Sequence, residues 1–521
     1  MRRLRLLFAA VLIVVLSVPA FAGPKEKEKG LAGRIDALLE QPDVSRGFWG
    51  IEIVDLDTGK TVYSHDAEKL FTPASNTKLF TTAATLALIG PDYRFRTTME
   101  TNGTIDKYGR LNGDLVLVGR GDPNLSGRVL PYSVKTERTQ PATKILEDMA
   151  DQVAARGVKV IDGNIVGDDS YYVYERYGEG WAQDDLVFEW GAPVSALTIN
   201  DNVIFVSILP GANAGDKAFI SITPFPEYYK IDNRVTTTPA GTGPRKLYVS
   251  RQPGSETLTL YGTIPVDDPG ASQMLAIDDP AKFAAELMYQ LLEQRGIAIY
   301  GKPVTKHTDL SSLSTFSVTT VASAGGGQET RKPMAPPTMV LASHESMPLA
   351  DDVKVTNKVS QNLHAELMLR LLGKIKGTSG SIEGGLEVER GWLTQADIRP
   401  DEYVFYDGSG LSRQNLVTPH AIVKLLTYAS EQPWGQMYID TFPVGGVDGT
   451  LVDRFKSAKM LGRVHAKTGS LGHVNALSGF ATTLKGQHIV FSILTNNHML
   501  TGKQAHDVID KIVTDVVEGK K

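Results

Sequence analysis

The chain begins and ends with the same kind of pattern, and this repetition limits the folds that it can adopt. Near the N-terminus, residues 50–54 and 61–63 alternate as two strands around an Asp-Thr-Gly turn. Near the C-terminus, residues 474–482 and 487–495 form a second strand pair, and a helical stripe follows at 503–517. Strands that follow one another so closely pair antiparallel, because a parallel pair needs a long crossover connection. A doubly wound parallel sheet is therefore disfavoured.

The long middle of the chain has a different pattern. From about residue 93 to 320 short strands and turns dominate, and one helix is predicted at 281–294. With 521 residues the chain is long enough for about three domains. The simplest organisation is one discontinuous domain, residues 23–92 and 338–521, interrupted by a mostly-β insertion at 93–337. We therefore expect an α+β architecture.

The first 22 residues are typical of a segment that is removed rather than folded. Three arginines among residues 2–5 precede an apolar run at 6–18, and Ala-Phe-Ala at 20–22 is a typical signal-peptidase site. The apolar run is shorter than the ~20 residues that a membrane-spanning helix needs. We therefore predict a cleaved signal peptide at 1–22, with an uncleaved anchor as the alternative, and no stable transmembrane segment after cleavage. An exported protein of the periplasm or cell envelope is expected.

The composition excludes several kinds of chemistry. The chain has no Cys, so disulfides, thiolate nucleophiles, iron–sulfur clusters and Cys-ligated zinc are impossible. Its ten histidines include no His-x-x-x-His pair, which is the spacing of a zinc-peptidase helix. The formal charge of −5 gives no reason to expect a nucleic-acid partner. Hydroxyls, amines, carboxylates and histidines remain for any catalysis, and no metal or cofactor is predicted.

One short motif places a nucleophile beside a base. Ser75 and Lys78 are three residues apart at the start of a helix predicted to run to Leu88, so both lie on one face. A serine hydroxyl needs a base to remove its proton, and a neutral lysine can be that base. The helix N-terminus also stabilises developing negative charge. A single Ser-x-x-Lys match, however, also arises by chance in a chain of this length.

Two further motifs could complete such a site. Ser360-x-Asn362 stands where helical spacing begins. Its hydroxyl and amide could relay a proton and hold a substrate carbonyl, although a helix N-cap is the simpler interpretation. Lys467-Thr468-Gly469 precedes a strand. Its cation and hydroxyl could hold a substrate carboxylate, and its glycine permits a close backbone approach, with an ordinary turn as the alternative.

The three motifs occur in the order that β-lactamases and penicillin-binding proteins share. The segments around them resemble the D-alanyl-D-alanine carboxypeptidase/endopeptidases of the class C, low-molecular-mass penicillin-binding proteins. These segments are PASNTKLFTTAATLALIGPDYRF (73–95), GDLVLVGRGDPNL (113–125), GAPVSALTINDN (191–202), TNKVSQNLHAELMLRLLG (356–373), DGSGLSRQNLVTP (407–419), PVGGVDGTLVDRF (443–455) and GRVHAKTGSLGHVNALSGF (462–480). They run through nearly the whole mature chain in the family's order.

This resemblance implies a fold. We expect a penicillin-binding/serine β-lactamase-like domain: an antiparallel sheet covered by the terminal helices, with an all-helical lobe that carries Ser360. The 93–337 region is similar to the large insertion of this family and is expected to form two subdomains. The segment Asp407–Gly410 lacks the first glycine of a nucleophile elbow, so we expect it to shape a loop beside the site.

The resemblance also implies roles for the motif residues. Ser75 would attack the carbonyl between two D-alanines and form an acyl-enzyme, with Lys78 as its general base. Lys78 must then be neutral near pH 7, so we expect burial and the nearby Lys467 cation to lower its pKa. Ser360 would shuttle the proton to the leaving D-alanine, and Asn362 would hold Lys78 and the substrate amide.

The strand motif would bind the other end of the substrate. Lys467 and Thr468 are expected to bind the terminal carboxylate, and Gly469 to allow the strand its close approach. The backbone N–H groups of Ser75 and Ser470 would form the oxyanion hole. Ser470 replaces the threonine that is commoner in this family, but a hydroxyl is retained.

A serine DD-peptidase without a metal or cofactor is therefore expected. Its substrates would be peptidoglycan stem peptides, cleaved as a carboxypeptidase, an endopeptidase or both, and β-lactam antibiotics would inhibit it covalently. Two alternatives remain open. One is a serine β-lactamase with the same nucleophile, and the other is a non-catalytic cell-wall-binding protein in which the insertion carries the function.

Overall fold

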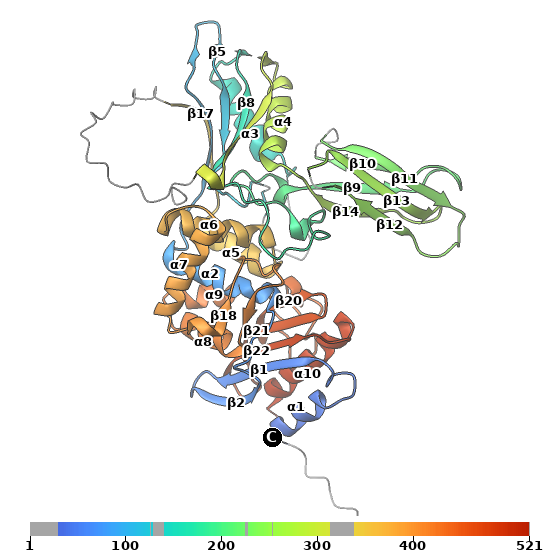
Figure 1. The fold of residues 1–521 in the computed structure, drawn as a ribbon, viewed down its shortest axis with the longest axis vertical. Helices are drawn as coiled ribbons and strands as arrows, with labels where there is room; N and C mark the ends of the chain where they lie inside the picture. The colour runs from blue at the N-terminus through green and yellow to red at the C-terminus, as the bar shows by residue number, and fades with distance from the viewer. Residues whose placement is uncertain are drawn as a thin grey trace, which may run out of the picture.

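The computed structural model describes residues 30–125, 127–128, 140–224, 228–252, 254–312 and 338–519. Figure 1 shows an elongated molecule with three parts. A body at one end contains the sheet formed by the N- and C-terminal strands, together with most of the helices. A second unit of strands and helices lies at the opposite end, and an arm of strands projects to the side between them.

One antiparallel sheet joins the two ends of the chain. Its order is β2-β1-β22-β21-β20, so the N-terminal β1 lies directly beside the C-terminal β22, with Ile51 opposite Ile493. The strands are β1 (Phe48–Asp55), β2 (Lys60–His65), β20 (Val464–Leu471), β21 (Val474–Thr482) and β22 (His488–Asn496). The strand pairs predicted at the two ends of the chain are confirmed, and they belong to a single sheet.

Both faces of this sheet are buried, because successive residues point into two different cores. The terminal helices α1 (Leu31–Leu39) and α10 (Gly502–Glu518) cover one face, and Ile493 packs into the core beneath them. Leu494 points the other way and joins the core around the central helix α2 (Thr77–Leu88). The arrangement of sheet and terminal helices agrees with the predicted α+β fold.

A lobe of helices surrounds α2. Its other members are α5 (Leu349–Lys358), α6 (Asn362–Lys376), α7 (Ile382–Gln395), α8 (Pro419–Ser430) and α9 (Gly435–Asp440), with the short pair β18 (Tyr403–Val404) and β19 (Leu416–Val417). Two threonines of α2 can be buried because their hydroxyls donate to carbonyls one turn back. Thr82 donates to Lys78 at 2.6 Å and Thr85 to Thr81 at 2.7 Å. A helix with polar side chains therefore lies at the centre of the lobe.

The region between α2 and α5 forms the remaining two parts. The end unit has a five-stranded sheet of order β16-β8-β6-β3-β17 and a four-stranded sheet of order β15-β7-β5-β4. Its strands are β3 (Arg96–Thr101), β4 (Thr104–Ile105), β5 (Arg110–Asn112), β6 (Leu115–Val118), β7 (Val160–Ile161), β8 (Ile165–Val173), β15 (Ala298–Ile299), β16 (Pro303–Thr308) and β17 (Met339–Glu345). Helices α3 (Lys144–Ala155) and α4 (Pro280–Glu293) share its hydrophobic core.

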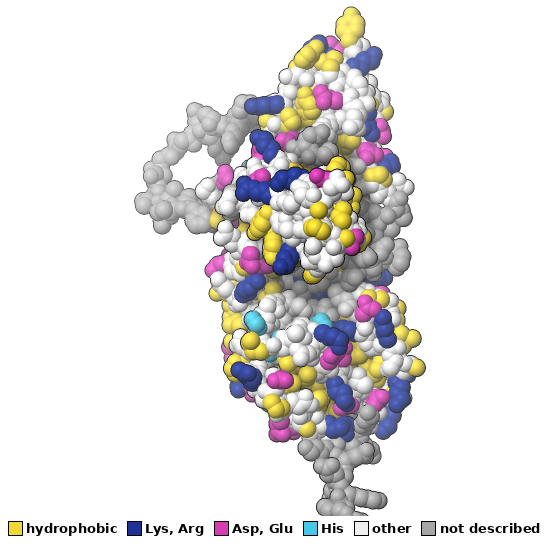
Figure 2. Space-filling model, turned by 90° about the vertical axis from the view of Figure 1, so that its right-hand side faces the viewer, with side chains coloured by type: hydrophobic (Ala, Val, Ile, Leu, Met, Phe, Trp, Pro, Cys, Tyr) yellow, Lys and Arg dark blue, Asp and Glu magenta, His cyan; other side chains and the backbone are white. Residues whose placement is uncertain are grey.

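The arm consists of two three-stranded sheets, ordered β10-β9-β14 and β11-β13-β12. Its strands are β9 (Val203–Leu209), β10 (Phe219–Thr223), β11 (Lys230–Thr238), β12 (Lys246–Ser250), β13 (Thr257–Pro265) and β14 (Ala271–Ala276). The arm points toward the viewer in Figure 2, which shows hydrophobic side chains among lysines and arginines on its surface. Phe219, Tyr248 and Tyr261 are among its exposed aromatic residues.

The structure contains one long helix in this region that the sequence analysis did not predict. Helix α3 buries Leu146, Met149 and Val153, which recur at helical spacing. Polar residues occupy most of its other positions, so the helical pattern in the sequence is weak. The helix is recognised from the core into which these apolar side chains pack.

The structure also moves one predicted boundary. The sequence division at 337/338 assigns β17 to the discontinuous domain. In the structure β17 pairs with β3, with Glu345 opposite Arg96, and completes the edge of the insertion's five-stranded sheet. The chain therefore leaves the insertion after β17. The unpaired backbone groups at the edge of β3 form hydrogen bonds with the returning strand.

The predicted signal peptide at 1–22 lies outside the residues that the structure describes. In the part of the chain that is described, no helix combines the length and the apolar character needed to span a bilayer.

Candidate active site

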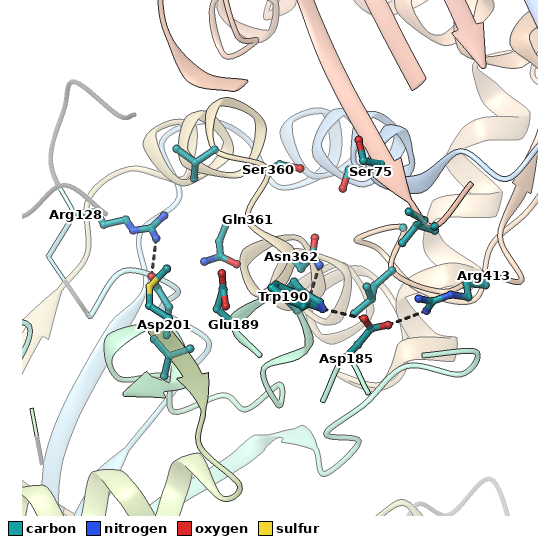
Figure 3. A pocket seen from close by; sticks show the side chains of 18 residues that line it. Ser75, Arg128, Asp185, Glu189, Trp190, Asp201, Ser360, Gln361, Asn362 and Arg413 are labelled. Atoms are coloured by element: carbon teal, nitrogen blue, oxygen red, sulfur yellow. Dashed lines mark hydrogen bonds and ion pairs between the residues drawn. The ribbon is translucent and has the colours of Figure 1, made fainter. Parts of the chain in front are cut away.

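A cavity of about 460 Å³ opens where the sheet, the helical lobe and the insertion meet (Figure 3). The predicted site residues that line it are Ser75, Ser360, Asn362 and Ser470. Lys78 and Lys467 are fully buried and contact this lining from inside the protein. The fold thus brings together groups from widely separated parts of the chain.

Ser75 and Lys78 meet at the start of α2. Ser75 lies in the short 3₁₀ helix Ala74–Asn76, which continues into α2, so the two side chains are one turn apart on one face. Lys78 Nζ lies 2.8 Å from Ser75 Oγ. Its other neighbours are Asn362 Oδ1 at 2.6 Å and the Ser409 carbonyl oxygen at 2.5 Å. A neutral amine can donate its two hydrogens to these acceptors and direct its lone pair at Ser75.

Burial favours the neutral amine that this geometry needs. It lowers the pKa of Lys78 to about 7, against the opposing influence of the Asp407 and Glu366 carboxylates. Burial, together with repulsion from Lys78, holds the pKa of Lys467 well below its usual value. Burial is the main cause of the low pKa of Lys78, and the two buried amines also repel each other when both are protonated.

Ser360 connects α5 to α6 and faces the second buried amine. Its φ of 60° lies in the left-handed region, which is costly for a serine. Lys467 Nζ donates to Ser360 Oγ at 2.8 Å and to the Thr468 carbonyl oxygen at 2.8 Å. The N-cap of α6 is Gln361, whose side chain accepts a hydrogen bond from the Leu363 N–H at 3.1 Å. The N-cap interpretation of Ser360 is therefore wrong.

Strand β20 presents backbone groups at the open edge of the sheet. It is the last strand in the sheet order, and the Ala466 N–H donates to the Pro443 carbonyl on its open side at 3.0 Å. Because backbone groups alternate along a strand, the Ser470 N–H points to the same side as that of Ala466. The Thr468 hydroxyl lies 2.8 Å from the Thr450 hydroxyl.

Gly469 lets β20 pass close to the segment that carries Ser75. A Cβ at Gly469 would lie 2.7 Å from the Pro73 carbonyl oxygen and 3.1 Å from Asn76 Nδ2. Asn76 Nδ2 itself donates to the Lys467 carbonyl at 3.2 Å. The close backbone approach expected of this glycine is present, and any side chain would push the strand away.

The loop after β18 supplies one contact to Lys78 that the sequence motifs did not predict. Asp407 accepts hydrogen bonds from the Gly410 N–H at 2.8 Å and the Ser412 N–H at 2.6 Å, which folds the loop tightly. Glu366 of α6 accepts from the Ser409 N–H at 2.9 Å and anchors the loop to the lobe. The expected loop beside the site is therefore present. Its contact with Lys78 is made by a backbone carbonyl, which carries no residue signature.

The insertion closes the cavity with residues that no motif predicted. The Trp190 carbonyl accepts from Asn362 Nδ2 at 2.7 Å, so the insertion fixes the amide that contacts Lys78. The Trp190 indole N–H donates to Asp185 at 2.9 Å, and Arg413 pairs with Asp185 at 2.8 Å (Figure 3). The segment 191–202, which resembles the family, starts directly after Trp190. It was the one sequence feature that could have indicated that this part of the insertion lines the cavity.

In the described part of the chain, one group of side chains could offer metal ligands. Glu68, Glu402 and His420 bring their ligand atoms within 4.8 Å of one another. The Arg399 guanidinium already lies 2.8 Å from Glu68 and 3.4 Å from Glu402, so an arginine side chain pairs with both carboxylates. These residues do not line the cavity.

Comparisons with known proteins agree with the site. The sequence profile of the D-Ala-D-Ala carboxypeptidase 3 (S13) family matches residues 31–324 and 327–516. A D-alanyl-D-alanine carboxypeptidase of Actinomadura sp. (strain R39) is 32% identical over 475 residues, which cover 89% of this chain and 80% of the relative.

Solved structures agree with the fold. The crystal structure of penicillin binding protein 4 from Haemophilus influenzae matches with a TM-score of 0.76 at 24% identity, covering 94% of this chain and 99% of that one. A structure of the same protein complexed with a novel β-lactam has a TM-score of 0.72 at 23% identity, covering 93% and 98%. The predicted fold class is therefore confirmed. With the profile match along nearly its whole length, the chain belongs to the D-Ala-D-Ala carboxypeptidase 3 (S13) family.

Proposed function

We propose that this protein is a serine DD-peptidase that cleaves the D-Ala-D-Ala end, the D-Ala–diamino acid cross-link, or both, in peptidoglycan stem peptides. One observation carries the proposal. Two hydroxyl–amine pairs, Ser75 with Lys78 and Ser360 with Lys467, each at 2.8 Å, meet the same cavity. A nucleophile with a neutral base and a second hydroxyl that can relay a proton are what two-step acyl transfer needs.

Acylation begins at Ser75. Neutral Lys78 takes the Ser75 proton as Oγ attacks the carbonyl between the two D-alanines. The negative oxygen that forms lies between the N–H groups of Ser75 and Ser470, and each such donor stabilises the transition state by about 3 kcal/mol. Asn362 keeps Lys78 oriented and binds the amide of the substrate.

The second pair completes bond cleavage. Ser360 gives its proton to the leaving nitrogen as the C–N bond breaks. The proton that Lys78 took from Ser75 passes to Ser360 in its place, so Lys78 is neutral again. Lys467 and Thr468 bind the terminal carboxylate of the substrate. Neutral Lys78 then takes a proton from an attacking water and returns it to Ser75 Oγ as the ester breaks, which releases the shortened peptide. A β-lactam would open on Ser75 in the same way and stay bound, because its leaving group remains tethered to the acyl part.

We propose that the mature chain is a catalytic domain interrupted by an insertion. The catalytic domain is residues 23–92 and 338–521, apart from β17, which pairs with β3 of the insertion. The insertion, 93–337, forms the end unit and the arm. Cleavage of the signal at 1–22 would place the protein in the periplasm or cell envelope, where peptidoglycan lies.

The purified mature protein should release D-alanine from a D-Ala-D-Ala pentapeptide. The measurement is time-resolved release of free D-alanine, with cross-linked wall dimers as a parallel substrate. Intact mass after benzylpenicillin treatment should show a stable adduct on Ser75. An adduct that disappears rapidly with penicilloate turnover would favour the β-lactamase alternative, and absence of both reactions would favour a non-catalytic wall-binding protein.

Gly469→Ala is expected to slow acylation by displacing β20 from the start of α2. The added Cβ would meet the Pro73 carbonyl at 2.7 Å, and overpacking against backbone typically costs about 1–3 kcal/mol. A displaced oxyanion donor should reduce the benzylpenicillin acylation rate by about tenfold or more. The matched control is Gly391→Ala on α7, where a Cβ meets nothing within 4 Å. Equal rates for the two variants would contradict this role of the glycine.

A further inference from the structure

The cavity extends past Ser360 to a buried ion pair that the mechanism above does not use. Arg128 Nη2 lies 2.9 Å from Asp201 Oδ2, and the two side chains are 7% and 4% exposed. Both residues line the cavity. In Figure 3 Ser360 lies between Ser75 and this pair, which stands at the end of the cavity away from Ser75.

The backbone is strained where it delivers Asp201. Asn200, Asp201 and Asn202 are consecutive left-handed residues, with φ of 54°, 55° and 55°. Buried hydrogen bonds hold this turn: the Ile199 N–H donates to Asn202 Oδ1 at 3.2 Å, and Asn202 Nδ2 donates to the Pro193 carbonyl at 2.8 Å. Such strain persists where the surroundings fix it, and it concentrates at sites that bind ligands. Here it places a carboxylate in the wall of the cavity.

The position of this ion pair points to a function beyond stability. A buried ion pair contributes little net stability, because removing both charges from water offsets their attraction. Asp201 Oδ1 also lies 3.3 Å from His364 Nε2 of α6, so the pair is tied to the helix that begins with Asn362. A guanidinium held rigidly in this way suits recognition of a planar carboxylate.

The chemistry of the reaction determines which part of a substrate reaches this end. The acyl part stays on Ser75, while Ser360 protonates the leaving nitrogen. The leaving part therefore extends beyond Ser360, along Gln361, which also lines the cavity. Free D-alanine is too short to reach far. The leaving part of a cross-link is a diamino acid joined to a second stem peptide, which carries carboxylates and amides further from the broken bond.

We propose that Arg128, oriented by Asp201, binds a carboxylate of the leaving stem peptide when the substrate is a cross-linked dimer. This inference rests on the proposed DD-peptidase function and adds to it the determinant of endopeptidase action. The Arg128–Asp201 end of the cavity discriminates between a cross-linked dimer and a pentapeptide, whose leaving group does not reach it.

The test compares two substrates on each protein variant. The ratio of kcat/KM for dimer cleavage to kcat/KM for D-alanine release from a pentapeptide is measured for wild type, Arg128→Gln and Asp201→Asn. Loss of a charge-assisted contact should lower this ratio by about ten- to hundredfold in Arg128→Gln. The matched control is Arg454→Gln, which removes a partly buried arginine paired with Asp510 of α10. Its ratio should equal that of wild type.

Benzylpenicillin acylation of each variant reports whether it has folded. If Arg128→Gln fails to acylate, the nearly isosteric Asp201→Asn variant is the test instead. Its ratio of dimer cleavage to D-alanine release should also be lower than that of wild type. A further measurement needs no variant: wild-type protein is given dimers in which the carboxylates of the leaving stem are amidated, except any carboxylate next to the broken bond, which Lys467 and Thr468 would bind. These dimers should be cleaved about tenfold or more slowly than the free acids.

The outcomes separate this inference from the proposed function. A wild-type protein that releases D-alanine but cleaves no dimer, an unchanged ratio in a folded Arg128→Gln variant, or indifference to amidation each overturns the role of Arg128. Each of these leaves the DD-peptidase function standing. Failure of wild type to release D-alanine would instead overturn the function itself.

Discussion

Ser75→Ala should abolish both peptide hydrolysis and covalent labelling by penicillin. The Ser75 hydroxyl, 2.8 Å from Lys78 Nζ, is the atom that forms the ester in the proposed mechanism. Removing the nucleophile of a serine hydrolase typically lowers kcat by about 10⁶-fold, because no acyl-enzyme can form. The remaining groups can still bind the substrate. D-alanine release from a pentapeptide and intact mass after benzylpenicillin treatment measure the two effects.

The control for this variant is another serine that loses a hydrogen bond outside the cavity. Ser430 on α8 donates to the Thr427 carbonyl at 2.7 Å, so Ser430→Ala removes a comparable local contact. We expect this control to keep its D-alanine release and its penicillin adduct. A persistent adduct on the Ser75→Ala protein would refute the assignment of the nucleophile.

The acylation rate should rise with pH through a pKa near 7 that belongs to Lys78. Burial lowers the pKa of this amine to about 7, and only its neutral form can accept the Ser75 proton. The rate constant for benzylpenicillin acylation is therefore expected to be flat above about pH 8 and to fall about tenfold per pH unit below pH 6. Stopped-flow or quenched mass measurements between pH 5 and pH 9 would give the profile.

A lysine-to-arginine substitution removes the base but keeps a cation. Arginine stays protonated throughout this pH range, so Lys78→Arg should lose about 10²- to 10⁴-fold in acylation rate. Lys306→Arg is the matched control, because Lys306 is an exposed lysine paired with Asp168 at 2.8 Å. We expect that control to acylate at the wild-type rate.

A second buried group titrates in the same range and needs its own control. Burial raises the pKa of Asp122 to about 7, although this carboxyl lies in the insertion. Asp122→Asn removes that titration and should leave the acid limb of the profile in place. Loss of the limb in Asp122→Asn, or a flat wild-type profile, would show that Lys78 is not the base.

The tertiary structure, rather than the motifs, gives Lys78 the low pKa that the proposed base needs. The spacing of Ser75 and Lys78 was readable because residues three apart on a helix share a face, which is local geometry. The acceptors Asn362 Oδ1 and Ser409 O come from α6 and from the loop after β18. Their contact depends on how the lobe packs, and burial of the amine, which sets its pKa, depends on the same packing.

The overall architecture shows the same division. Period-two alternation predicted β21 and β22 and the N-terminal pair, because a strand with alternating faces carries its own signature. The pairing of β17 with β3, which moves a predicted boundary, has no local signature, since any strand of suitable length can cover an open edge. Helix α3 was missed for a related reason, because its apolar stripe is short among polar residues.

The sequence by itself determined the family, the pattern of the main sheet and the identity of the groups that could do chemistry, because motifs and periodicity report local geometry. Only the tertiary structure decided that Ser360 faces Lys467 rather than capping α6, and that burial lowers the pKa of Lys78. It alone also brought Arg128 and Asp201 of the insertion to the end of the cavity. These properties arise from contacts between distant segments and from exclusion of water, which no single segment encodes.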